Sequence, residues 1–74
     1  MGRLLLKFSE RVKSNNLGRI EQLAEKCGVW IESIDEEMGR VAPLKVVRIS
    51  GAKEKLAHFD HELIRLPSIT RKSI

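Results

Sequence analysis

The stretch from Leu17 to Ile34, LGRIEQLAEKCGVWIESI, decides the fold because its periodicity changes at a single glycine. Before that glycine, apolar residues recur every three or four positions, which is the pattern of an amphipathic helix. Gly28 accepts the left-handed backbone conformation that ends many helices. After it, the β-branched and aromatic run from Val29 to Ile34 is typical of a strand. The chain is therefore predicted to pass directly from a helix into a strand.

The residues before this helix predict a strand and a helix start. Apolar side chains alternate from Leu4 to Phe8, so we expect a strand over Arg3 to Ser9 with one buried face. The tripeptide Ser14-Asn15-Asn16 follows, and its side-chain oxygens can accept hydrogen bonds from the free N–H groups at a helix start. A strand followed by a helix is thus expected ahead of Gly28.

The residues after Ile34 predict a hairpin. Asp35 to Arg40 is polar and is expected to be the turn, while Leu44 to Ser50 alternates again as a strand. Pro43 lies near the start of that strand, where a missing backbone donor is tolerated. We therefore expect Val29 to Ile34 and Leu44 to Ser50 to pair as antiparallel strands.

A second helix and a last strand complete the pattern. The helix is expected to open at Gly51-Ala52 and to end before Pro67, because the residue before a proline disfavours helical geometry. Its apolar stripe consists of Leu56, Phe59, Leu63 and Leu66. Ile69 to Ile74 then returns as a short strand.

The order strand, helix, strand, strand, helix, strand predicts a single α+β domain over residues 1–74. This is the ferredoxin-like βαββαβ arrangement, with a four-stranded antiparallel sheet and two helices on one face. A chain of 74 residues supports one core with a thin stability margin, so association with a partner is expected. The single cysteine, Cys27, excludes an intrachain disulfide and fits a cytoplasmic setting. The apolar run at Leu4 to Leu6 is too short to span a membrane.

Two stretches resemble the ACT domain family. Asn16 to Ile20 with Gly28 to Ile34 is similar to the first helix and second strand of these domains, and Val46 to Gly51 with Leu63 to Ile69 is similar to their second half. The resemblance extends to the ACT-like C-terminal domain of nickel-responsive repressors and to related stand-alone regulators. It implies a regulatory domain that forms dimers or higher oligomers and binds an amino acid near the loop after the first strand.

The resemblance places a candidate ligand site at that loop, Lys13 to Gly18. Free N–H groups at a helix start, together with the helix dipole, suit a carboxylate or a phosphate. The alternative is that the same side chains serve only as helix caps, and Asn15 stands where the family usually has a glycine. The candidate residues are Ser14, Asn15, Asn16 and Gly18.

The uncovered face of the predicted sheet is the second candidate site. On the strand assignments above it carries apolar residues beside Lys7, Glu32 and Arg48, which predicts a contact surface for a second copy of the chain. An edge strand is the other route to self-association. The apolar residues expected at the oligomer interface are Leu5, Trp30, Ile34 and Val46.

Other chemistry finds little support in the residues. His58 and His61 are too few for a metal site, Cys27 lies on an apolar stripe, and no motif indicates catalysis or a cofactor. We therefore expect no enzyme activity. The alternative function is nucleic-acid binding on the open sheet face, since RNA recognition motifs share this order of elements, and the net charge is +4. Trp30 is the one strand aromatic that this face offers for base stacking.

Overall fold

A computed structural model of the chain describes residues 1–10, 14–66 and 68–74. It confirms the predicted order of strands and helices. The elements are β1 (Gly2–Ser9), α1 (Asn16–Cys27), β2 (Trp30–Met38), β3 (Pro43–Gly51), α2 (Lys53–Leu63) and β4 (Thr70–Ser73).

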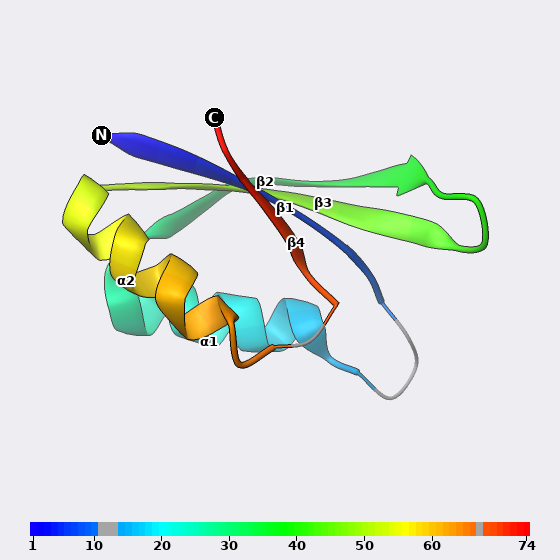
Figure 1. Cartoon of the computed structure of the whole chain (residues 1–74), viewed down its shortest axis with the longest axis horizontal. Helices are drawn as coiled ribbons and strands as arrows, with labels where there is room; N and C mark the ends of the chain where they lie inside the picture. Colours follow the sequence, from blue (N-terminus) through cyan, green and yellow to red (C-terminus); the bar gives the residue numbers. More distant parts are fainter. Residues whose placement is uncertain (11–13, 67) are drawn as a thin grey trace.

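The strands form one antiparallel sheet in the order β2-β3-β1-β4. The consecutive strands β2 and β3 form a hairpin, whereas β1 lies between β3 and β4. Both helices cover the same face of the sheet, and the β2–β3 hairpin continues beyond them (Figure 1). The two edges of the sheet are therefore β2 and β4, and one face has no helical cover.

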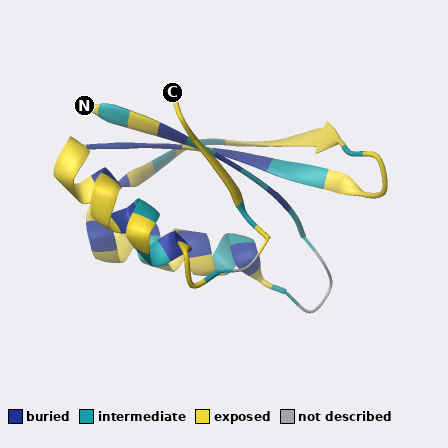
Figure 2. Cartoon of the chain, in the orientation of Figure 1, coloured by how far each residue is buried: buried dark blue, intermediate teal, exposed yellow. Residues whose placement is uncertain are grey.

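The core lies between the helices and the central strands (Figure 2). Alternate residues of β1 point into it, and its largest fully buried side chains include Phe8 and Phe59. Residues at cross-strand positions share a face, so Leu6 opposite Val47 continues the same apolar layer into β3. The buried cluster consists of Leu4, Leu6, Phe8, Ile20, Ala24, Cys27, Val29, Val47, Ile49, Leu56, Phe59 and Leu63.

The turn from α1 into β2 is the one that the sequence predicts. Gly28 has a φ of 75°, and its N–H reaches the carbonyl oxygens of Ala24 and Glu25. The N–H of Val29 also donates to the Ala24 oxygen, at 3.0 Å. Val29 is buried in the core, so the first residue after Gly28 already packs beneath the sheet that β2 joins.

Two predicted boundaries were wrong. The strand β2 continues to Met38, through the residues expected to form the turn, because Asp35 and Glu36 pair with cations of the adjacent strand β3 and Glu37 pairs with Lys7 of β1. The helix α2 ends at Leu63, and its backbone continues as a turn in which the N–H of Leu66 donates to the Leu63 oxygen. Pro67, the predicted stop, lies outside the described residues.

A β-bulge in β2 overturns one predicted side-chain placement. The pairing with β3 shifts between Ile31 and Ser33, so that Glu32 and Ser33 share one side of the strand. Ile34 then lies opposite Val47, which belongs to the core face. The sequence placed Ile34 on the uncovered face, whereas the bulge turns it to the helix side, where it is 43% exposed.

Close packing at the start of β1 generates a stability prediction. Gly51 lies opposite Gly2, and a β-carbon on Gly51 would stand 2.7 Å from a methyl carbon of Val29. We expect Gly51→Ala to lower the free energy of unfolding by about 1–3 kcal/mol, because the buried Val29 cannot move away. Urea denaturation measures this change.

The partner glycine supplies the control. A β-carbon on Gly2 would stand 3.1 Å from a methyl carbon of Leu56, so a shift of a few tenths of an ångström relieves the contact. Gly2→Ala is therefore expected to cost less than Gly51→Ala. Equal costs for the two substitutions would contradict the proposed clash with Val29.

Candidate functional site

The uncovered sheet face is a layer of ion pairs. Acidic side chains of β2 reach across to basic side chains of β1 and β3, at N–O distances of 3.1 to 3.5 Å. The hydroxyl of Ser50 also donates to Glu32, at 2.7 Å. The pairs on this face are Arg3–Glu32, Lys7–Glu37 and Arg48–Asp35.

The apolar residues predicted on this face differ in their exposure. Val46 lies between Lys7 and Asp35 across the sheet and is only 6% exposed, while Leu5 is partly buried. Trp30, at the start of β2, is 47% exposed. The face is therefore mostly charged, and the apolar contact surface expected there is reduced to Trp30.

Exposed apolar side chains are instead concentrated along the edge strand β2. Trp30, Ile34 and Met38 all belong to it, and Met38 is 88% exposed. Glu36 lies between Ile34 and Met38 on the helix side, where Lys45 donates to its carboxylate at 2.7 Å. The hydrogen bond and the charge of Lys45 hold the pKa of Glu36 below its usual value. An apolar and acidic strip thus follows an edge whose outer backbone groups have no strand partner in the described sheet.

The predicted ligand loop is stabilised by a residue that the sequence analysis did not identify. The Glu10 carboxylate accepts hydrogen bonds from the N–H groups of Asn16 (2.9 Å) and Leu17 (3.0 Å), and from the Ser14 hydroxyl (3.3 Å). Asn15, at the N-cap position, makes no side-chain capping bond. The predicted Ser/Asn cap is therefore corrected: Glu10 is the cap of α1.

This cap bears directly on the candidate ligand residues. The structure brings Ser14, Asn16 and the backbone start of α1 around one carboxylate, which is the chemistry expected of a ligand, but the carboxylate belongs to the chain. The Asn15 side chain covers Gly18, whose β-carbon would stand 2.6 Å from it. Lys13 lies outside the described residues. Ligand binding here stays a prediction, and a ligand must compete with Glu10.

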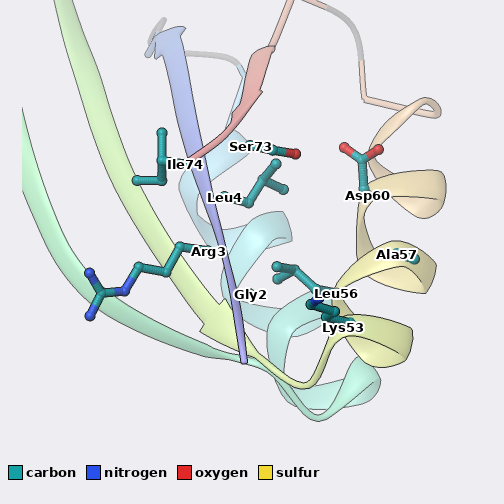
Figure 3. Close-up of a pocket in the computed structure, with 9 residues that line it drawn as sticks. All are labelled: Gly2, Arg3, Leu4, Lys53, Leu56, Ala57, Asp60, Ser73 and Ile74. Carbon is teal, nitrogen blue, oxygen red and sulfur yellow. The ribbon is translucent and has the colours of Figure 1, made fainter.

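Two open grooves lie along α2. The first, of about 360 Å³, lies between α2 and the ends of β1 and β4. In Figure 3 Leu4, Leu56 and Ser73 lie between the strands and the helix, whereas the Arg3 side chain extends away from α2. The second, of about 310 Å³, lies between α1 and α2 and is lined by Arg19, Gln22, Leu23, Lys26, Glu62, Arg65 and Leu66.

The remaining candidate chemistry can be placed on the described residues. Cys27 is buried in the core, and no group of three or more potential metal ligands occurs in the described part of the chain. His58 and His61 are exposed on α2. Among the described helices, none is both long and apolar enough to cross a membrane.

Comparisons with known proteins establish the fold. No protein-family model and no curated protein matches the sequence. The structure is similar to a de novo designed protein, with a TM-score of 0.69 and 12% identity over 99% of this chain and 92% of the other. It is also similar to the ACT domain of GTP pyrophosphokinase from Chlorobium tepidum, with a TM-score of 0.62 and 12% identity over 99% and 95% of the two chains.

An enzyme contains the same fold as a part of its chain. Formyltetrahydrofolate deformylase from Burkholderia mallei matches with a TM-score of 0.65 and 10% identity, over 97% of this chain and 26% of the enzyme. At such low identities the likeness concerns the fold alone. The chain therefore has the βαββαβ fold that ACT domains share, and no catalytic family is identified.

The Glu10 cap generates the prediction of this subsection. Glu10→Ala removes the acceptor for two backbone N–H groups, and we expect a loss of about 1–2 kcal/mol in the free energy of unfolding. Glu10→Gln is expected to be intermediate, because a neutral amide forms weaker hydrogen bonds than a carboxylate. Chemical denaturation gives both values. Glu21→Ala, in the exposed part of α1, is the control, and equal effects at positions 10 and 21 would contradict the cap.

Proposed function

We propose that this chain is a small, non-catalytic regulatory or assembly domain of the ACT type, and that it associates with itself through its sheet. The observation that carries the proposal is that the edge strand β2 exposes Ile34 and Met38 on its helix side and Trp30 on the uncovered face. The fold that the chain shares with an ACT domain supports the regulatory role.

The geometry favours the edge over the uncovered face. Three ion pairs cover the face. Burying these charged groups in an interface removes their hydration, which costs free energy unless the partner supplies new hydrogen bonds. The edge, in contrast, offers backbone donors and acceptors ready to pair with another strand. It also offers apolar side chains whose burial stabilises a small domain.

Nucleic-acid binding, the alternative function, finds no comparable support. Arg3, Lys7 and Arg48 on the uncovered face are each paired with a carboxylate, and Lys72 of β4, opposite Leu5, is the one described strand cation on this face without an ion pair. A phosphate would have to displace these carboxylates. The alternative therefore stays a prediction from the sequence.

An effector site at the start of α1 completes the proposal. An amino acid or another small carboxylate would replace the Glu10 carboxylate on the N–H groups of Asn16 and Leu17. Such an exchange frees Glu10 and the preceding end of β1, and β1 is the strand that joins β3 to β4. This gives an effector a physical route to the sheet.

Self-association is tested by sedimentation velocity over a range of protein concentrations. We expect the wild-type chain to associate, and Ile34→Lys to weaken association at least tenfold, because a charge replaces an apolar side chain at the edge. Val41→Lys is the matched control, since Val41 is 99% exposed in the hairpin turn and outside both strands. A wild-type chain that stays monomeric at all concentrations would overturn the proposal.

The effector site is tested by thermal shift against the amino acids. Binding to the folded state raises the melting temperature with the logarithm of ligand concentration. We expect this rise to be larger in Glu10→Ala, where no internal carboxylate competes for the two backbone N–H groups, than in the wild type. If none of the amino acids stabilises either the wild type or Glu10→Ala, the loop is only a helix cap.

A further inference from the structure

The two edges of the sheet are complementary in direction and in charge. The strands β2 and β4 run in opposite directions, because each neighbouring pair in the order β2-β3-β1-β4 is antiparallel. The distal half of β2 carries Asp35, Glu36 and Glu37, while β4 carries Arg71 and Lys72. We propose that β2 of one copy pairs with β4 of the next, which makes the association head-to-tail.

This inference rests on the proposed self-association through β2 and identifies β4 as the surface that β2 of another copy binds. A copy displaced sideways within the plane of the sheet presents its β2 antiparallel to β4 of the first copy. The helices of both copies then lie on the same side of one continuous sheet. Pairing two β2 edges centred on Glu36 would instead set their carboxylates against each other, and pairing two β4 edges centred on Arg71 and Lys72 would set cations against each other; like charges across strands are destabilising.

The backbone hydrogen bonds select the residues that can pair. The N–H of Ile74 donates to the Arg3 oxygen of β1, at 3.1 Å. Because the bonding direction alternates along an antiparallel strand, Arg71 and Ser73 direct their backbone groups to the open edge. The same alternation, followed through β1 and β3, assigns Ile34 and Glu36 of β2 to the outward positions.

One register satisfies both the backbone and the charges. With Ser73 opposite Ile34 of the next copy, Arg71 lies opposite Glu36 and Lys72 lies opposite Asp35. Lys72 makes no ion pair with the described residues of its own chain and can add to the Asp35–Arg48 pair of the next copy. Arg71 and Glu36 already have partners in their own chains, Asp60 and Lys45, so their contact extends existing ion pairs. The pairing spans the four residues from Ile34 to Glu37, which follow the bulge, and the four residues of β4, Thr70 to Ser73.

The groove beside β4 receives the apolar side chain in this register. Ser73 lines the groove of about 360 Å³, together with Leu4, Leu56 and Ala57. Ile34 of the next copy lies on the helix side and opposite Ser73, so in this register its side chain reaches the groove between β4 and α2. Figure 3 shows the residues that line this groove. The exposed apolar residue of one edge is thereby buried against the other edge.

Two matched proline variants test the head-to-tail arrangement. Glu36→Pro and Ser73→Pro each remove one outward N–H on an edge strand, where proline is tolerated because the internal ladder keeps its donors. We expect the wild-type chain to grow beyond a dimer with concentration, and each variant alone to be monomeric. Mixed in equal amounts, the two variants are expected to form a 1:1 heterodimer, because each retains one intact edge.

The outcomes separate this inference from the proposed function. If Ser73→Pro still dimerises while Glu36→Pro does not, β2 pairs with itself, which overturns the head-to-tail arrangement and leaves self-association standing. A monomeric wild type overturns both. An equimolar mixture that stays monomeric overturns the head-to-tail arrangement, and circular dichroism of each variant confirms that it is folded.

A pair of charge variants tests the same register without proline. Asp35→Lys and Lys72→Glu each place like charges across the predicted contact, so each alone is expected to weaken association at least tenfold. The two variants mixed together restore opposite charges at one contact and are expected to associate again. If the mixture binds no more tightly than the separate variants, the register is wrong.

Discussion

The structure depends on the constraint that two short helices can cover only one face of the four-stranded sheet. On the covered face, Leu6 and Val47 lie opposite each other and are fully buried. On the other face the same strands meet water, so they carry ion pairs. The aliphatic parts of such side chains can shield an apolar neighbour, which accounts for the burial of Val46 without helical cover.

The bulge in β2 makes this charged layer consistent with the pairing of the strands. Two residues, Glu32 and Ser33, occupy one side of β2, and every later residue is reversed relative to a regular strand. Asp35 and Glu37 therefore reach Arg48 and Lys7 on the uncovered face. Without the bulge their side chains would lie on the helix side, away from these cations. The bulge also buries the Ser33 hydroxyl without a hydrogen-bond partner among the described residues, which lowers the stability of the fold.

Local periodicity was enough to predict the order of elements, the core stripe of β1 and the glycine that ends α1. The features that sequence reasoning missed depend on partners distant in the chain. The bulge follows from the register with β3 and has no glycine to mark it. Glu10 is six residues from Asn16, and only the path of the loop brings its carboxylate to α1. Met38 was assigned to the turn because its acidic neighbours are polar, although their cross-strand cations extend β2.

The presence of this fold in a designed protein, in part of an enzyme and in an ACT domain means that the fold alone does not specify a function. The features that set this chain apart are the irregular pairing of one edge strand and the short length of the other. The bulge limits the regular outer part of β2, and β4 is only four residues long. Both features protect edges against uncontrolled pairing. The strand surface that remains on each side is short, so the proposed self-association through it would bury little surface and would depend on protein concentration.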